Sequence, residues 1–232
     1  MHQMHTMTDS LAHDIRSPMT AIRGKLETSL DAHSYEDLHE AVISSIEMLD
    51  HLSLFLTESL DVAEARADAL RLNAGEVDLQ DWLSMLVDYY RPSFLEQQLS
   101  IDCGASESAK VNADAGLMHR MMANLLENEL AHLPPKCTVH LTTFVNGSSV
   151  CLLVEDDGPG FPPDLIPYLF ERNTKGKGSK GHGLGLAFVD AVVRAHGGSI
   201  TAFNGFNGGT RIHVDLPIYV HSLAVKGEEG RR

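Results

Sequence analysis

Basic residues are scarce in this sequence of 232 residues. Eighteen Lys and Arg stand against 32 Asp and Glu, which gives a formal net charge of −14 at pH 7. A surface that binds nucleic acid needs a basic patch or stripe to neutralise phosphates, so this balance argues against nucleic acid as a partner. It fits instead a soluble protein whose partners bring a basic or metal-loaded surface of their own.

Cysteine is also rare. The three cysteines, Cys103, Cys137 and Cys151, are odd in number and scattered through apolar, strand-like contexts. Their spacing does not match a metal site. We therefore expect buried, reduced thiols and a reducing compartment, the cytoplasm.

Long apolar runs are missing as well. No stretch approaches the ~20 residues that span a bilayer, and no signal peptide is visible. Apolar residues nevertheless make up 43% of the chain and charged residues 22%, a balance that supports packed cores and argues against global disorder. We expect one or two folded domains without membrane contact by this stretch.

Residues 4–30 carry apolar side chains at helical spacing and are predicted to form one amphipathic helix. On that helix His13 lies about 170° from the centre of the apolar stripe, so we expect it to face water. Ser17 is one turn further on and shares the same face. Pro18 removes a backbone hydrogen bond to Asp14 and is expected to bend the helix just after His13.

A second helical stripe runs from Leu38 to Leu70, after a break in the pattern at Asp31–Glu36. Two long helices joined by a short turn form a hairpin, and a lone hairpin cannot bury both of its stripes. Pairing with a second copy would bury them in a four-helix bundle, so we expect a homodimer.

From Asn73 onward the hydrophobic period changes, and short strand-like runs alternate with helical stretches. This pattern predicts an α+β chain whose second part is an α/β sandwich with a mixed sheet under helices. We expect a hairpin of residues 1–72, an α/β domain of residues 73–218 and a flexible tail of residues 219–232. The predicted strands are residues 76–79, 99–103, 110–112, 138–145, 149–155, 199–204 and 210–216, and the predicted helices are residues 80–97, 115–133 and 184–196.

The most informative stretch begins where a predicted strand ends in Asp156-Asp157-Gly158-Pro159-Gly160. A carboxylate beside glycines can accept hydrogen bonds from a flat ligand while the backbone approaches closely. A second glycine run, Gly181-His-Gly-Leu-Gly-Leu186, opens a helix whose free N–H groups can bind phosphate. The segment between them holds Arg172 and Lys175 and could close as a basic lid. Each feature alone could be a turn or a solvated loop, but their joint order predicts a nucleotide site.

Two further patterns contain residues that could bind a metal ion or act as a nucleophile. Asn124 and Asn128 lie one turn apart on the helix 115–133, and amide oxygens can bind Mg²⁺ beside phosphates. An isolated pair of asparagines on a helix more often has no role beyond contacting solvent. A solvent-facing neutral His13 is a nucleophile near neutral pH, and Asp14 could orient it or take its proton. Taken alone, a histidine in this position is more often an ordinary surface histidine before a helix kink.

Together these residues resemble the catalytic core of a sensor histidine kinase of two-component signalling, over residues 11–217. His13–Pro18 resembles the phosphoacceptor box, Asn124–Asn128 the N box and Asp156–Gly160 the first glycine box. Leu169–Arg172 resembles the F box, Gly181–Leu186 the second glycine box and Gly208–Thr210 the last one. The resemblance implies a dimeric four-helix bundle followed by a gyrase/Hsp90/histidine kinase-like ATP-binding domain.

The resemblance also implies roles. His13 would accept the γ-phosphoryl group of ATP with Asp14 as general base, and Ser17 would position a water that removes phosphate from the response regulator. Asn128 would bind Mg²⁺, and Asp156 would bind the adenine amino group. The other implied ATP-binding residues are Asn124, Gly158, Gly160, Arg172, Lys175, Gly181, Gly183, Leu184, Gly185, Leu186 and Thr210. The implied partner is a response regulator receiver domain, and the chain is expected to be the cytoplasmic portion of a membrane-anchored bacterial sensor.

Some positions depart from the family pattern. Glu129 stands where the family has a small residue, Ala131 replaces a basic residue, and Asn173 replaces an aromatic one. The first two favour an alternative, a non-catalytic phosphotransfer or scaffold dimer with a degraded nucleotide site. A second alternative, an ATPase like the gyrase and Hsp90 relatives, is disfavoured because Asn124 stands where those enzymes carry a water-activating Glu.

Overall fold

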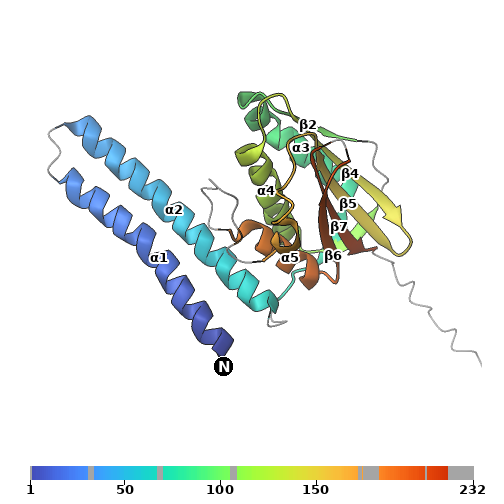
Figure 1. The fold of residues 1–232 in the computed structure, drawn as a ribbon, viewed down its shortest axis with the longest axis horizontal. Coiled ribbons are helices and arrows are strands. Elements are labelled where there is room, and N and C mark those ends of the chain that lie inside the picture. The colour runs from blue at the N-terminus through green and yellow to red at the C-terminus, as the bar shows by residue number, and fades with distance from the viewer. Residues whose placement is uncertain are drawn as a thin grey trace, which may run out of the picture. The chain divides into compact units, whose positions relative to one another are not determined.

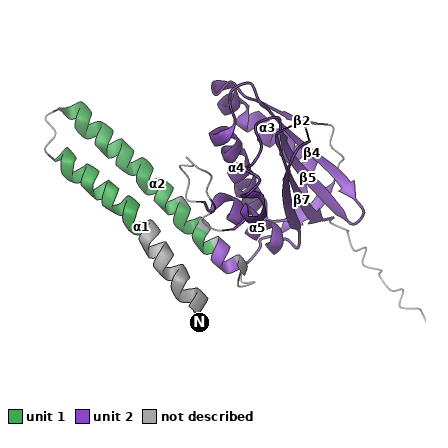
Figure 2. Cartoon of the chain, in the orientation of Figure 1, with its two compact units in different colours: residues 1–60 green, residues 61–232 purple. Residues whose placement is uncertain are grey.

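The computed structural model describes residues 2–30, 34–66, 70–104, 109–171, 174, 183–206 and 208–218. Of residues 2–14 it describes the backbone alone. The chain divides into two compact units, residues 1–60 and residues 61–232 (Figure 2). The predicted tail, residues 219–232, lies outside the described residues.

The first unit is a hairpin of two long helices, α1 (His2–Ser29) and α2 (Tyr35–Arg66), and the end of α2 belongs to the second unit (Figure 1). Helix α1 runs without interruption through Pro18. Ser34 caps α2, because its hydroxyl oxygen accepts a hydrogen bond from the Asp37 N–H at 3.0 Å. The two predicted helices are confirmed, with α2 beginning three residues before its apolar stripe.

Helix α2 carries two apolar stripes. One is buried and consists of small and large residues at helical spacing: Ala41, Ser45, Leu52 and Phe55. The other is at least 40% exposed and consists of Leu38, Val42, Ile46 and Leu49. Helix α1 also leaves Met19 57% and Leu26 39% exposed. Packing within one chain therefore covers only part of the hairpin's apolar surface, as the sequence predicted.

The second unit is an α/β sandwich in which α3, α4 and α5 cover one face of a five-stranded sheet (Figure 1). The sheet order is β2-β4-β5-β7-β6, with β2 and β4 parallel and the other pairs antiparallel. The predicted mixed sheet under helices is thus confirmed. The elements are β1 (Gly75–Asp78), α3 (Leu79–Glu96), β2 (Ser100–Cys103), β3 (Lys110–Ala113), α4 (Ala115–His132), β4 (Thr138–Asn146), β5 (Ser149–Asp156), the 3₁₀ helix η1 (Ile166–Tyr168), α5 (Gly185–Ala195), β6 (Ser199–Asn204) and β7 (Thr210–Pro217).

Two details differ from the sequence prediction. Strands β1 and β3 pair with each other in a separate antiparallel sheet, and Val111 of β3 forms an isolated antiparallel bridge with Ile218, just after β7. The 3₁₀ helix η1 was not predicted. Hydrophobic periodicity identifies a strand but not its partner, and a single helical turn is too short to show a period.

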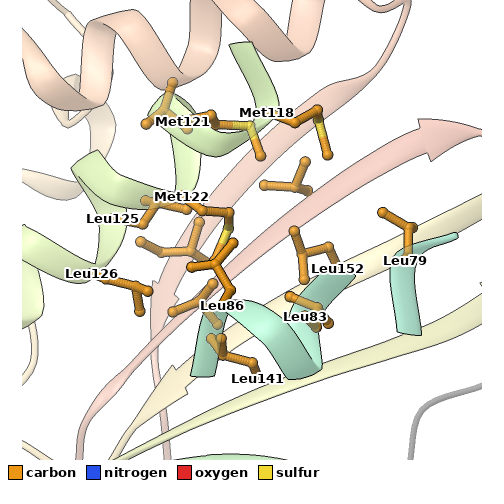
Figure 3. Close-up of a cluster of buried hydrophobic side chains, with 14 of the residues drawn as sticks. Leu79, Leu83, Leu86, Met118, Met121, Met122, Leu125, Leu126, Leu141 and Leu152 are labelled. Carbon is orange, nitrogen blue, oxygen red and sulfur yellow. The ribbon is translucent and has the colours of Figure 1, made fainter. Parts of the chain in front are cut away.

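The core lies between the helices and the sheet. Alternate residues of β5 and β7 point into it, among them Val150, Leu152, Val154 and Ile212, and all four are fully buried. Helix α4 supplies Met118, Met121, Met122, Leu125 and Leu126, which pack toward Leu83 and Leu86 of α3 (Figure 3). Leu125 and Leu126, which follow Asn124 in the helix, are fully buried in the core. Their burial fixes the direction in which the polar side of α4 faces.

Helices α4 and α5 run antiparallel, and their ends are joined by polar contacts. The Asp114 carboxylate caps α4 by accepting hydrogen bonds from the N–H groups of Gly116 at 3.0 Å and Leu117 at 3.1 Å. The Asp114 N–H donates to Nε2 of His196, just past the end of α5, at 2.9 Å. Nδ1–H of the same ring donates to the Val192 carbonyl at 2.7 Å. The start of α4 is therefore fixed to the end of α5.

Candidate nucleotide site

Asp156, the last residue of β5, is 4% exposed and has its carboxylate held by three donors. Oδ1 accepts a hydrogen bond from the Gly158 N–H at 2.7 Å. Oδ2 accepts from the Thr210 N–H at 2.9 Å and from the Thr210 hydroxyl. The first and last glycine boxes therefore meet on a single buried carboxylate, through the contacts of Gly158 and Thr210 with Asp156.

Glycines allow the backbone to close around Asp156. Gly209 has a φ of +76°, and a Cβ there would lie 1.8 Å from the Asp156 carbonyl oxygen. A Cβ on Gly158 would lie 2.4 Å from the Leu133 side chain at the end of α4. Neither position can carry a side chain without displacing the carboxylate or its neighbours.

The loop after Asp156 is fixed by Asn204 at the end of β6. The Asn204 amide donates to the Phe161 carbonyl at 2.8 Å and accepts from the Phe161 N–H at 2.8 Å. Gly160, with a φ of +81°, lies close enough that a Cβ there would be 2.9 Å from the Asn204 Oδ1. This role of Asn204 is not visible in the sequence, because an Asn-Gly pair after a strand has the signature of an ordinary turn.

Glu129 of α4 is a second buried acid in this region and is 4% exposed. Burial, and after it the negative charge of Asp156, raises the pKa of Glu129 to about 8. Cys137, which follows α4, has its pKa raised by burial first and then by the charge of Asp157. The sequence identified Glu129 only as a departure from the family pattern. Its proximity to Asp156 depends on how α4 packs against β5.

Asn124 and Asn128 lie half-buried on one side of α4, with Leu125 and Leu126 fully buried, as predicted. Nδ2 of Asn124 donates to the Arg120 carbonyl at 3.0 Å, one turn back. A Cβ on Gly185, the first residue of α5, would lie 2.6 Å from the Asn124 Oδ1. The missing side chain of Gly185 thus allows the start of α5 to approach Asn124.

The segment before α5 is also shaped by glycine. Gly183 has a φ of +69°, a conformation that favours glycine. Leu184 is buried and Leu186 is half-buried, so both help to fix the start of the helix. The structure therefore gathers two clusters of predicted site residues, one around Asp156 and one where α4 meets α5.

The other predicted site residues belong to neither of these two clusters. Arg172, Lys175 and Gly181 lie outside the described residues. Only the helical backbone is described for His13 and Asp14, and Ser17 is exposed on α1. None of the three cysteines forms a disulfide; Cys137 and Cys151 are buried as predicted, and Cys103 is half-buried.

Two family models match the chain. The His Kinase A (phospho-acceptor) domain matches residues 3–67, and the histidine kinase-, DNA gyrase B- and HSP90-like ATPase matches residues 113–220. The chain belongs to the sensor histidine kinase family. The resemblance seen in the sequence is thus confirmed, and the two matched domains correspond to the catalytic core of a sensor histidine kinase.

Relatives and solved structures agree with this assignment. The sensor histidine kinase TrcS of Mycobacterium tuberculosis is 31% identical over 232 residues, which cover 96% of this chain and 45% of TrcS. The sensor histidine kinase HprS of Escherichia coli is 29% identical over 93% of this chain and 48% of HprS. The histidine kinase core therefore spans about half the length of these curated relatives.

Among solved structures, the histidine kinase AdeS of Acinetobacter baumannii matches with a TM-score of 0.75 and 21% identity, over 90% of this chain and 98% of AdeS. ShkA in complex with AMPPNP matches with a TM-score of 0.70 and 24% identity, over 91% and 46%. ThkA in complex with the response regulator TrrA matches with a TM-score of 0.69 and 21% identity, over 92% and 61%. These likenesses establish the fold. Within the described ranges, no helix of the kinase core is both long and apolar enough to cross a membrane.

Replacing Glu129 by Gln should remove a pH dependence from the free energy of unfolding. A carboxyl whose pKa rises from 4.5 to about 8 on folding stabilises the folded state below its unfolded pKa and loses that contribution as pH rises to about 8. The variant should therefore gain stability over the wild type as pH increases, by roughly 2–4 kcal/mol at pH 8. Urea unfolding at several pH values measures this. Replacing the exposed Glu127 by Gln is the control, and a Glu129 effect independent of pH would contradict the assignment.

Replacing Gly185 by Ala should move the Asn124 amide while leaving the fold intact. The new methyl group would meet the end of a flexible side chain, and Ala is a better helix former than Gly, so the change in unfolding free energy should stay within about 1 kcal/mol. The shift of the Asn124 side-chain amide signals in an NMR spectrum measures the displacement. Gly75→Ala is the control, because nothing lies within 4 Å of a Cβ there. Unchanged Asn124 signals would refute this account of Gly185.

Proposed function

We propose that this chain is an ATP-dependent protein histidine kinase that phosphorylates its own His13. It then passes the phosphoryl group to an aspartate of a response regulator receiver domain and can also dephosphorylate that regulator. The observation that carries the proposal is the buried Asp156 carboxylate, fixed by three donors within a domain of the ATPase family. The match of the phospho-acceptor domain covers residues 3–67, which include His13, and this supports His13 as the residue that accepts the phosphoryl group.

The base subsite is proposed around Asp156. Its Oδ1 accepts the Gly158 N–H, and a carboxylate oxygen has capacity for a further donor, such as the amino group of adenine. Gly158 and Gly160 carry no side chain, so a flat base can approach the backbone at these two positions. The chemistry of the residues present thus fits a purine with an exocyclic amino group.

The phosphate and metal subsite is proposed where α4 meets α5. Asn128 would bind Mg²⁺ through its amide oxygen, and Asn124 would support the phosphates beside Gly183 and the first turn of α5. Leu184 and Leu186 fix that turn from its apolar side. Arg172, Lys175 and Gly181 are proposed as parts of the lid. Bound Mg²⁺ would supply neutralisation of the phosphate charge.

The proposed transfer has two steps. The neutral imidazole of His13 attacks the γ-phosphorus, the bond from that phosphorus to the bridging oxygen breaks, and ADP leaves while Asp14 takes the imidazole proton. An aspartate carboxylate of the receiver then attacks the phosphohistidine and frees the imidazole. Ser17 would position the water that hydrolyses the receiver's acyl phosphate. The crystallised complex of ThkA with a response regulator supports this partner class.

The domain organisation belongs to the same proposal. We infer a phosphotransfer hairpin of residues 1–72, an ATP-binding domain of residues 73–218, a tail of residues 219–232 and a hinge near Leu72–Gly75. The two compact units divide earlier, between Leu60 and Asp61, because the end of α2 packs with the second unit through Val62. We further propose that the chain is the cytoplasmic part of a membrane-anchored sensor.

The hairpin is proposed to pair with a second copy in a four-helix bundle. The stripe of Leu38, Val42, Ile46 and Leu49 leaves large apolar side chains at least 40% exposed. Burial of apolar surface contributes about 25 cal/mol per Å², so covering this stripe in a dimer is favourable. The homodimer then also brings two copies of His13 into one bundle.

Incubation with γ-labelled ATP and Mg²⁺ tests the kinase. The wild type should take up one acid-labile, base-stable label per chain, and His13→Ala should take up none because the accepting imidazole is lost. Asp156→Ala should abolish both labelling and nucleotide binding. Label that persists in His13→Ala would exclude His13 as the acceptor. A wild-type chain that binds no nucleotide would refute the proposal that the protein is a kinase.

Replacing Ile46 by Glu should dissociate the proposed dimer. A charge in the middle of the apolar stripe would be buried without a partner, which should weaken dimerisation at least tenfold. Light scattering after size exclusion measures the mass over a dilution series. His51→Glu is the control, because His51 is exposed and about 140° round the helix from Ile46. A wild-type chain that is already monomeric at high concentration would refute the bundle.

A further inference from the structure

Glu129 of α4 is a buried acid without a hydrogen-bond partner in the described part of the chain. The residue is only 4% exposed, and no donor that the structure describes forms a hydrogen bond to its carboxyl group. Asp156 is equally buried but has three donors, from Gly158 and Thr210. A polar group that is buried unpaired costs free energy, and a ligand that brings a donor removes that cost. The folded chain thus leaves an acceptor at Glu129 that remains available to a bound molecule.

The position of Glu129 on α4 turns its side chain toward the base subsite. Leu133 follows Glu129 by four residues, and its N–H donates to the Glu129 carbonyl at 2.9 Å. The two side chains therefore share one face at the end of the helix. On that face, Cδ2 of Leu133 would lie 2.4 Å from a Cβ on Gly158. Because the Gly158 N–H is itself bound to Asp156, this face of α4 meets the loop that closes around Asp156.

The electrostatics of this region agree with that placement. Burial first, and then the charge of Asp156, raise the pKa of Glu129, so the two carboxyl groups are close in space. Burial first, and after it the neighbouring acids Asp157, Asp156 and Glu129, raise the pKa of the Cys137 thiol. Sγ of Cys137 would lie 3.8 Å from a Cβ on Gly158. Glu129 therefore lies with Asp156 and Cys137 near Gly158, where the base is proposed to approach.

We propose that Glu129 determines base specificity, by accepting the second N–H of the exocyclic amino group whose first N–H binds Asp156. This rests on the proposed function and deepens it, because an amino group has two N–H bonds in different directions and Asp156 lies along one of them. A carboxyl group accepts a hydrogen bond whether it is ionised or protonated, so the role does not depend on the proton of Glu129. The small residue that the family has at this position could not supply such an acceptor.

The test compares the binding of ATP and N6-methyl-ATP to the full chain, each with Mg²⁺, by titration calorimetry. N6-methyl-ATP lacks one of the two N–H bonds, so the wild type should bind it about threefold to tenfold more weakly than ATP, the value of one hydrogen bond. Glu129→Ala removes the acceptor and leaves room for the methyl group, so this ratio should fall below about twofold. Glu129→Gln keeps an oxygen that accepts and should keep the wild-type ratio. Glu127→Ala is the matched control, because it makes the same change at an exposed residue of α4, and it should also keep the ratio.

Equal affinity of the wild type for ATP and N6-methyl-ATP would overturn the proposal without any variant, and so would an unchanged ratio in Glu129→Ala. Glu129→Met serves if the alanine variant does not fold: it keeps a long side chain without a carboxyl oxygen, and its ratio should also fall. A parallel Asp156→Ala titration should lose both nucleotides. A wild-type chain that binds neither nucleotide would instead refute the proposed function, and the role of Glu129 with it.

Discussion

The carboxylate of Asp156 holds together parts of the chain that are distant in sequence. It ends β5, accepts the N–H of Gly158 in the following loop, and accepts the N–H and hydroxyl of Thr210 at the start of β7. A buried carboxylate is costly unless donors surround it, so this arrangement is stable only when both segments are in place. The requirement for glycine at positions 158 and 209 follows from the same constraint, because a side chain there would occupy the space of the carboxylate or its backbone.

Glu129 is a second buried acid close to Asp156. Two acids in one buried region cannot both ionise without a large electrostatic cost, and the negative charge of Asp156 adds to burial in raising the pKa of Glu129 to about 8. The donors around Asp156 stabilise its negative charge, so Glu129 is the member of the pair that stays protonated at neutral pH.

The seam between α4 and α5 places the second half of the site. Three contacts run along it in antiparallel order: His196 with the Asp114 N–H, Phe188 with Arg120, and Gly185 with Asn124. Each of these three contacts fixes the distance between α4 and α5 at one position along the helices. The start of α5, where phosphate would meet free N–H groups, is therefore set by packing along the whole length of the helix and not by the glycine-rich segment alone.

In the hairpin unit, the apolar side chains of α2 are only partly buried. Its two stripes on α2 lie side by side, and burial within one chain selects Ala41, Ser45 and Leu52 while Val42 and Ile46 stay exposed. The small residues Ala41 and Ser45 allow the helices to approach, and Leu52 and Phe55 are buried in the same stripe, whereas the stripe of Leu38, Val42, Ile46 and Leu49 stays exposed.

By itself, the sequence determined the helices, most strand bounds, the two-part organisation and the family, because periodicity and motif order are local properties. The tertiary structure alone decided that β1 and β3 form their own sheet, that Glu129 lies near Asp156, that Asn204 fixes the Phe161 backbone and that Arg120 stacks on Phe188. These depend on which distant segments pair and how closely they pack. Such long-range contacts leave no period in the chain, so they become visible only once the sheet and its helices are assembled.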